Sequence, residues 1–337
     1  MTSNGDATAK VVPVRHYGSY VGTVLALVFL LMLVHTLYSK VPTGEVACRV
    51  VGGVRRCHDV VNWRFGWNVV GQYMTDTQVL HGIVVTIELT VLSMIIGIVL
   101  GIIIAVMRLS RSRLLSATAW SYTWFFRGTP VYVQILFWGN IAFLYKTMTL
   151  GIPFTHVAFL HLDMVSAITP FRAGLIGLGL NEAAYMSEIA RSGLIAVDEG
   201  QIEAATSLGM TRSQTLRLVV LPQAMRVIIP PTGNEVISML KTSSLVIAVS
   251  VTDLLGAVTN IYAATYQILP MLLVASLWYL SATTLLSIGQ FYLERRFAKG
   301  ALRTPPQTPI QRLRSDVRGI LSLFRTKRGV PANRVAT

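Results

Sequence analysis

The stretch 203–222, EAATSLGMTRSQTLRLVVLP, is polar and lies between long apolar runs. Its first triplet, 203–205, favours a helix, and Gly209 is a natural helix stop. Thr211 followed by Gln214 has the spacing of a capping box, which marks the start of another helix. The stretch therefore predicts a short helix, a glycine turn and a second helix that enters the following apolar run.

The apolar runs on both sides of this stretch indicate a membrane protein. The 337 residues are 53% hydrophobic and only 13% charged, with a mean hydropathy of +0.58, whereas soluble domains carry about 25% charged residues. A helix needs about 20 apolar residues to cross a bilayer. Six runs reach this length: 18–38, 80–107, 118–145, 166–191, 220–247 and 267–292. We expect an all-α integral membrane protein, in which 18–38 spans the membrane, since its apolar core is too long for a signal peptide.

The distribution of basic residues predicts the orientation. The formal net charge is +14, which in a soluble protein would suggest a nucleic-acid partner. Here most of the Lys and Arg residues fall in segments that share one side of the membrane when both termini are cytoplasmic, which fits the positive-inside rule. We therefore expect a multi-pass protein of the cell membrane with both termini inside and no nucleic-acid partner. The loop 39–79 is an exception, because it carries five basic residues on the outer side.

The expected organisation has five parts. They are a cytoplasmic N-terminal segment 1–17, the additional helix 18–38, an extracytoplasmic loop 39–79, a transmembrane domain 80–296 and a basic cytoplasmic tail 297–337. The two cysteines, Cys48 and Cys57, both lie in the loop, so a disulfide is expected there, and unlinked thiols are the alternative. In the tail, apolar residues from Ile310 to Phe324 share one helical face, which predicts a basic amphipathic helix on the inner leaflet. A disordered basic tail is the alternative.

Glycine and proline are expected to shape several of the spans. In FFRGTP, 125–130, Gly128 and Pro130 should interrupt the third span, because proline removes a backbone donor. The fifth span carries Pro222 and the pair 230–231. Broken helices are tolerated in membranes where protein or a water-filled cavity satisfies the freed backbone groups, so the fifth span is expected to line a pathway. In the second span, a G-x-x-x-G pattern at 97–101 allows close helix packing.

Several classes of chemistry are absent from the sequence. It has no G-x-x-x-x-G-K-[ST] phosphate loop, no His or Cys pattern with metal-ligand spacing, and no G-x-S-x-G elbow. We therefore expect no enzyme active site, no metal and no cofactor bound by this chain. If ATP is used, another chain must hold it.

Five motifs in order resemble those of ABC-importer permease subunits. The pattern EAA-x3-G-x9-[IV]-x-LP is met by Glu203, Ala204, Ala205, Gly209, Val219, Leu221 and Pro222. The stretches FFRGTPVYVQ (125–134), NEAAYMSEIARSGL (181–194), LPQAMR (221–226) and GNEVISMLKTSSL (233–245) look like the polar amino-acid branch of that family. The resemblance covers roughly 65–296. The triplet at 182–184 is also Glu-Ala-Ala but lacks the downstream Gly and Leu-Pro.

The resemblance implies a type I permease fold, with a core of five transmembrane helices to which this chain adds one N-terminal helix. It further implies that two permease subunits pair, identical or related, and that an external binding protein delivers an amino acid. Each subunit would seat a cytoplasmic coupling helix, about 198–212, in a cleft of an ATPase subunit that holds ATP and Mg. The residues implied in coupling are Gly200, Glu203, Ala204, Ala205, Gly209, Leu221 and Pro222.

Ionisable groups within the spans are candidates for the substrate pathway, because burying them in a membrane is costly. Glu182, with Asn181 and Tyr185, suits the ammonium and polar groups of an amino acid, and Asn234 with Glu235 completes the candidate set. Hydrogen bonding between helices is the alternative role for these residues. Another pair in these spans, Glu188 and Arg191, is three residues apart on one helix. We expect these two side chains to form a local ion pair rather than to contact the substrate.

Two other functions compete with an ATP-driven importer. An ion-coupled secondary transporter would also use broken helices and buried charges, but it usually shows internal repeats and more spans. A membrane scaffold that recruits proteins through its basic tail is the third possibility. Only an importer gives a reason for a helix, glycine turn and helix with the spacing of 203–222 on the cytoplasmic side.

Overall fold

The computed structural model describes residues 17–51, 54–151 and 158–297. These residues form two compact units, one made of the chain up to 79 with 258–276, the other of 80–257 with the chain from 277 onward. The predicted N-terminal segment before 17 and the predicted amphipathic tail helix lie outside the described residues.

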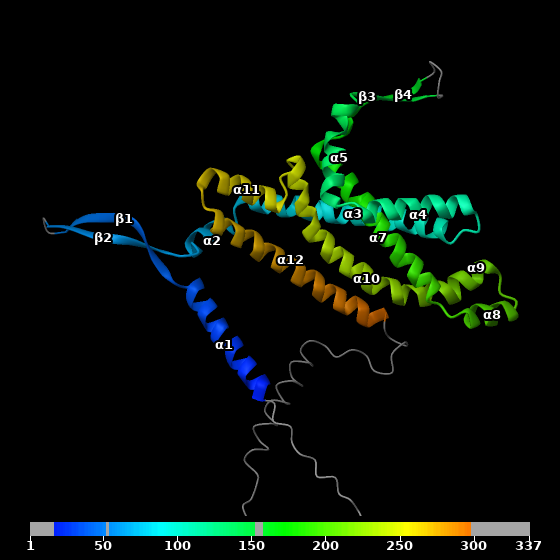
Figure 1. Ribbon diagram of the computed structural model, residues 1–337, viewed down its shortest axis with the longest axis horizontal. Helices are drawn as coiled ribbons and strands as arrows, with labels where there is room; N and C mark the ends of the chain where they lie inside the picture. Colours follow the sequence, from blue (N-terminus) through cyan, green and yellow to red (C-terminus); the bar gives the residue numbers. More distant parts are fainter. Residues whose placement is uncertain (1–16, 52–53, 152–157, 298–337) are drawn as a thin grey trace, which may run out of the picture. The chain divides into compact units, whose positions relative to one another are not determined.

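The first unit opens with helix α1 (Tyr17–Leu37) and a two-stranded antiparallel sheet, β1 (Lys40–Val51) and β2 (Val54–Trp63), followed by α2 (Trp67–Tyr73) (Figure 1). The indole of Trp67 ties the hairpin's exit to the end of α1, because its Nε1 donates to the Leu37 carbonyl at 2.8 Å. Trp67 also stacks on Tyr38 at a centroid distance of 6.1 Å. Along the sheet, the backbone register sets Cys48 opposite Cys57.

The second unit contains most of the helices. They are α4 (Arg113–Gly128), α5 (Val131–Leu144), α6 (Met164–Ala167), α7 (Pro170–Ile195), α8 (Glu199–Ser207), α9 (Arg212–Thr215), the π-helical turn η1 (Leu216–Val220), α10 (Leu221–Thr242) and the 3-10 helix η2 (Ser243–Val249). Three helices belong partly to each unit: α3 (Thr77–Arg108), α11 (Leu254–Thr265) and α12 (Ile268–Phe297). A second hairpin, β3 (Thr147–Gly151) and β4 (Ala158–Asp163), follows α5.

The two hairpins correct the expectation of an all-α protein. Both lie outside the apolar runs, and the first is rich in valine, at 41, 46, 50, 51, 54, 60 and 61. Valine has a stiff β-branched side chain that favours strands over helices. The described residues are therefore mostly helical, and their strands lie in two connecting segments.

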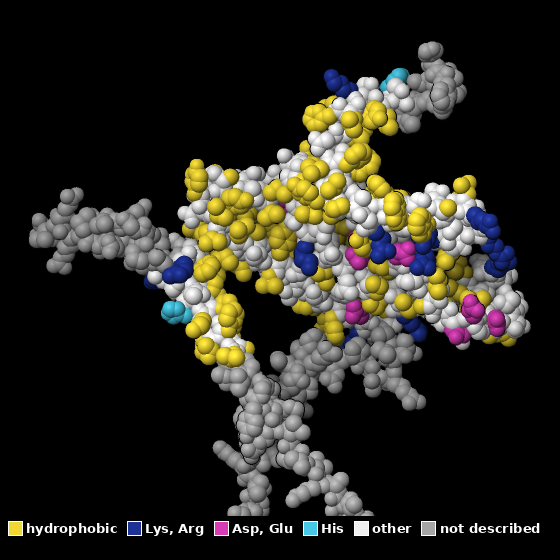
Figure 2. Space-filling view, in the orientation of Figure 1, with side chains coloured by type: hydrophobic (Ala, Val, Ile, Leu, Met, Phe, Trp, Pro, Cys, Tyr) yellow, Lys and Arg dark blue, Asp and Glu magenta, His cyan; other side chains and the backbone are white. Residues whose placement is uncertain are grey.

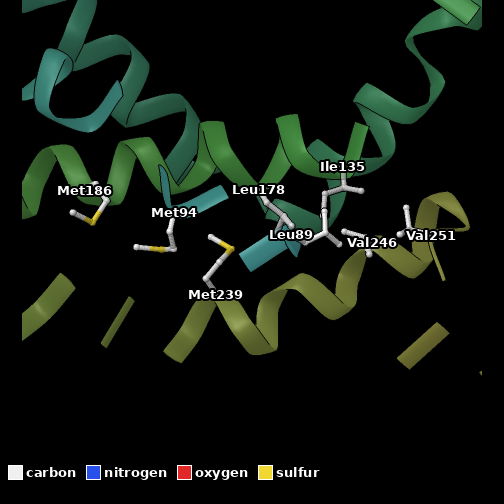
Figure 3. Close-up of a cluster of buried hydrophobic side chains, with 8 residues drawn as sticks. All are labelled: Leu89, Met94, Ile135, Leu178, Met186, Met239, Val246 and Val251. Atoms are coloured by element: carbon white, nitrogen blue, oxygen red, sulfur yellow. The ribbon is translucent and has the colours of Figure 1, made fainter. Parts of the chain in front are cut away.

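Helix α7 lies at the centre of the second unit. Figure 3 shows the core around it, formed by Leu89 and Met94 of α3, Ile135 of α5, Leu178 and Met186 of α7, Met239 of α10, Val246 of η2, and Val251. Glycines let the neighbouring helices approach closely. A Cβ on Gly101 of α3 would lie 2.6 Å from the Met186 Cβ, and one on Gly177 of α7 would lie 3.1 Å from the Ile135 Cα. The close packing predicted for the G-x-x-x-G pattern of α3 is thus confirmed.

The interruption predicted in the third span is also confirmed. Helix α4 ends at Gly128 and α5 begins at Val131, with Thr129 and Pro130 extended between them. In the fifth span, Pro230 and Pro231 sit inside α10, and the irregular geometry falls at its two ends, in η1 and η2.

Helix length and composition give up to three candidate membrane crossings within the described residues. Within the described residues, α3 and α12 are each long and apolar enough to cross a membrane, and the segment from Arg212 to Thr265 forms one further candidate that bends by 50° at its break. Helix α7 has the length but carries charged residues. The six crossings expected from the sequence therefore enter the proposal below.

Candidate functional site

The segment between α7 and α10 folds as the predicted helix, turn and helix. Asp198 caps α8, since its Oδ1 accepts from the Gly200 amide at 2.9 Å. At the other end, Gly209 adopts a positive φ of 75° and donates to the Thr206 carbonyl, while the Met210 amide donates to the Ala205 carbonyl. This pair of bonds is a Schellman motif, which satisfies the last carbonyls of a helix. Local sequence thus sets both ends of α8.

The next helix starts with the predicted capping box. The Thr211 amide donates to Gln214 Oε1 at 2.8 Å, and the Gln214 amide donates to Thr211 Oγ1 at 3.4 Å. The π-helical turn η1 then precedes Pro222, which has no N–H to offer the carbonyl four residues back. There the Leu221 amide bonds five residues back, to Leu216. Helix α9 consequently continues into α10 without a gap (Figure 1).

The residues implied in coupling separate into two places. Gly200, Glu203, Ala204 and Gly209 are exposed on α8 and its turn, whereas Ala205 is buried. Leu221 and Pro222 are exposed at the start of α10. Leu208, at the end of α8, is 82% exposed. The hook, by which we mean residues 198–211, therefore displays polar groups and two exposed large apolar side chains, Ile202 and Leu208, of which Leu208 is the less covered by the described chain.

A cavity of about 300 Å³ lies between α5, α7 and α10. Four of the five predicted pathway residues line it: Asn181, Glu182, Tyr185 and Glu235. Ser238 and Thr242 add hydroxyl groups, and Val131, Leu178 and Met239 form its apolar part. Asn234 is not part of this cavity, because its Oδ1 faces α12 and accepts from Gln290 Nε2 at 2.9 Å.

Glu182 is the most buried acidic residue of this cavity. It is 3% exposed, and its Oε1 has no hydrogen-bond partner within the described residues. Gly97 of α3 makes room for it, since a Cβ there would lie 2.9 Å from the Glu182 Cβ. A buried polar atom without a partner is costly, so an occupant that supplies a donor would relieve that cost.

Asn181 also makes a hydrogen bond between helices, at the break between α4 and α5. Pro130 cannot donate to the carbonyl of Phe126, four residues earlier. Instead, Asn181 Nδ2 donates to that carbonyl at 2.8 Å, and Gln134 Nε2 donates to it at 2.9 Å. These amides satisfy the backbone where α4 and α5 separate, which is what a broken membrane helix requires. The contact supports the alternative of hydrogen bonding between helices for Asn181.

A basic and aromatic group lies next to the cavity. The Arg127 guanidinium carbon lies 5.2 Å from the centre of the Tyr185 ring, a cation–π geometry. The predicted local ion pair is confirmed, with Glu188 at 2.9 Å from Arg191, and the same carboxylate also lies 3.5 Å from Arg108 of α3.

One buried acid was missed by the sequence analysis. Asp253 is fully buried, accepts from the Gly256 amide at 2.9 Å and from the Tyr279 hydroxyl at 3.3 Å, and so caps α11. An Asp just before an apolar helix is a cap signal that could have identified it. Within the described residues, no group of three or more His, Cys, Asp or Glu side chains is placed to hold a metal ion.

The amino-acid sequence is similar to those of membrane proteins from transport systems. Residues 97–299 match a family described as binding-protein-dependent transport system inner membrane component. The arginine transport system permease protein ArgU of Corynebacterium glutamicum is 51% identical over 245 residues, which cover 72% of this chain and 75% of that protein. The histidine/lysine/arginine/ornithine transport system permease protein HisM of Escherichia coli is 34% identical over 210 residues, or 61% and 83% of the two chains.

Solved structures show the same similarity in three dimensions. A crystal structure of an amino acid ABC transporter with histidines superposes with a TM-score of 0.56 at 35% identity, covering 65% of this chain and 94% of that one. The methionine ABC transporter MetNI, in an inward-facing conformation, has a TM-score of 0.52 at 19% identity over 65% of this chain and 96% of that one. The latter likeness concerns the fold alone.

Proposed function

This chain belongs to the family of binding-protein-dependent transport system inner membrane components, and on that premise we propose that it is the permease subunit of an ATP-driven importer for cationic amino acids. The observation that carries the proposal is the preformed, exposed hook between two helices that line one acidic cavity. The chain itself changes no covalent bond of the substrate. ATP and Mg are held by the partner ATPase.

The cavity supports the cationic class of substrate. Glu182 and Glu235 both line it, and no Lys or Arg is among its described lining residues. A guanidinium or ammonium group would supply donors to the carboxylates, and such charge-assisted bonds are among the stronger ones in proteins. The relatives named above include permeases for arginine and for histidine, lysine, arginine and ornithine.

The geometry links the hook to the cavity. Glu182 lies on α7, which ends at Ile195 just before the hook, and Glu235 lies on α10, which follows it through η1. A partner that moves α8 therefore acts on the two helices that carry the carboxylates. We expect closure of an ATPase dimer to draw two hooks together and open the cavity outward, with hydrolysis resetting it, an alternating-access cycle.

The proposed assembly follows from this cycle. Two permease subunits pair in the cell membrane, each contacting an ATPase through the exposed residues Gly200, Glu203, Ala204 and Gly209. The buried Ala205 holds α8 in place, and Leu221 and Pro222 transmit the movement into α10. An extracytoplasmic binding protein delivers the amino acid. We further propose a type I core of five spanning helices, to which α1 adds one more span. Both termini are in the cytoplasm, and a disulfide joins Cys48 and Cys57. An ion-coupled secondary transporter is not favoured by the relatives.

The test is uptake of labelled arginine into liposomes that contain the full assembly, with ATP hydrolysis measured in parallel. Replacing Glu203 with Arg, or Gly209 with Pro, should abolish uptake and uncouple it from hydrolysis while membrane insertion stays normal. Glu203→Gln serves as the matched control, because it keeps the size of the side chain and should lose less. Uptake that survives both disruptive changes would refute the coupling role of α8.

A further inference from the structure

We propose that the turn between α3 and α4 forms a binding site for the phosphate headgroup of an anionic phospholipid in the inner leaflet. A cavity of about 530 Å³ lies at this turn, and four arginines line it: Arg108, Arg111, Arg113 and Arg191. They come from the end of α3, the turn, the start of α4 and the end of α7. The fold therefore gathers charges that are up to 83 positions apart in the chain. Figure 2 shows Lys and Arg side chains collected over this end of the second unit.

The charge of the site is only partly neutralised. Arg108 and Arg191 share the single carboxylate of Glu188, at 3.5 and 2.9 Å. Arg111 and Arg113 are exposed and have no carboxylate within 4.0 Å in the described part of the chain. Four guanidinium groups and one carboxylate leave a net formal charge of +3 at the cavity. Arginine suits phosphate especially well, because its planar fork can donate two parallel hydrogen bonds.

The backbone adds to the attraction. Helix α4 has 16 residues, and its N-cap Ser112 makes no side-chain bond to the first turn. The positive end of the helix dipole and its free N–H groups thus point toward the same turn. Neither feature would define a site alone, but here they reinforce a cluster of arginines that already forms a cavity.

The apolar wall of the cavity favours a lipid over a free phosphate. Trp120 of α4 lines the cavity together with Leu109 and Ala117, and it is 53% exposed. Trp120 stacks on Trp124 one turn further along, at a centroid distance of 6.2 Å, and Trp124 is exposed as well. Trp is favoured at the membrane–water interface, where its ring lies at headgroup level. An occupant with a negative head and an apolar tail matches both parts of the surface.

The position of the turn selects the leaflet. In the proposed orientation, the end of α3 and the hook face the cytoplasm, where anionic lipids give the membrane surface a negative potential. A headgroup held by Arg108, Arg113 and Arg191 would contact α3, α4 and α7 together. Bound lipid would therefore hold the inner ends of these three helices in place.

The site can be tested with the full-length chain in nanodiscs of phosphatidylcholine that contain phosphatidylglycerol brominated in its acyl chains. Bromine quenches nearby tryptophans, and the difference between wild type and Trp120→Phe isolates the signal of Trp120. The preference for brominated phosphatidylglycerol over brominated phosphatidylcholine is measured for each variant. In Arg111→Gln/Arg113→Gln it should fall by about thirtyfold, at about 1 kcal/mol for each basic residue near the surface. Arg111→Lys/Arg113→Lys keeps the charge but not the planar fork, so it should lose less of the preference than the glutamine pair and more than none.

Matched controls decide between a site and general surface charge. Arg217→Gln/Arg226→Gln removes the same charge from exposed positions that do not line the cavity, and it should leave the preference unchanged. Inorganic phosphate at constant ionic strength should not displace the brominated lipid. The proposal is overturned if the 111/113 variant quenches like wild type, if the control pair loses as much, or if phosphate alone releases the lipid.

Discussion

The interior around α7 and the hook that follows it obtain their shapes in different ways. In the interior, glycines such as Gly101 and Gly177 bring helices together, and Asn181 supplies a hydrogen bond to a carbonyl 55 positions away. The hook depends on bonds between residues at most five positions apart, at Asp198, Gly209 and Thr211. The interior is thus shaped by long-range packing, while the hook is folded before any partner arrives. A transport subunit needs both, because a movement of α8 reaches the cavity only if the helices attached to it are closely packed.

The largest expected effect is at Gly101, where long-range packing leaves no space. In Gly101→Val the Cβ would lie 2.6 Å from the Met186 Cβ and 3.0 Å from the Ser187 amide nitrogen. Because the second contact is to the backbone, it can be relieved only by a shift of the helix. We expect a loss of about 3 kcal/mol in stability or more, at the upper end for overpacked cores. Gly289→Val is the matched control, because nothing lies within 4 Å of its Cβ position. Thermal aggregation in detergent should separate the two variants, and equal behaviour would contradict the packing described for α7.

An effect of intermediate size is expected at Glu182, where the interior meets the cavity. Glu182→Gln removes the charge at constant size, and we expect arginine-stimulated ATP hydrolysis to fall by about tenfold to a hundredfold, as for the loss of a hydrogen bond to a charged group. Binding to the ATPase should be unchanged. Asn234→Ala is the control, since Asn234 bonds α12 rather than lining the cavity. Unchanged stimulation in Glu182→Gln, or an equal loss in Asn234→Ala, would remove the cavity from the substrate pathway.

The smallest expected effect is at Gly209, where the hook depends on a positive φ. Gly209→Ala has open space around its Cβ but a φ of 75°, whereas Gly71 has the same open space inside α2. The first change should cost about 1–2 kcal/mol, and Gly71→Ala should stabilise α2 by up to about 1 kcal/mol. Hydrogen exchange of the backbone amides should therefore accelerate in α8 and slow in α2. Changes of the same sign would show that the turn does not hold α8.

The same contrast explains what the sequence could predict. The hook and the start of the helix after it were predictable, because caps and the glycine stop act over a few residues. The break at Thr129–Pro130 was predictable for the same reason. Glu182 and Glu235 could be found as charges inside apolar runs, but the sequence did not show that Asn234 bonds Gln290 of α12 and does not line the cavity.

Other features depend on contacts that a linear reading does not contain. The bond from Asn181 to the Phe126 carbonyl joins positions 55 apart, so the sequence alone did not predict it. The arginine cavity joins α3, α4 and α7, and only the fold brings Arg191 to the turn at Arg111. Asp253 was overlooked in a connecting segment although it caps α11. The two hairpins were not predicted, because both lie in segments between the apolar runs of membrane length.

The central claim is that a partner ATPase binds the hook. Site-specific photocrosslinking tests this claim most directly. A photoreactive residue at Leu208, which is 82% exposed at the end of α8, is compared with one at Leu144, which is 69% exposed at the end of α5. In native membranes, we expect a crosslink to an ATP-binding subunit from position 208 and none from position 144. Crosslinks to that subunit from both positions, or from neither, would contradict the account.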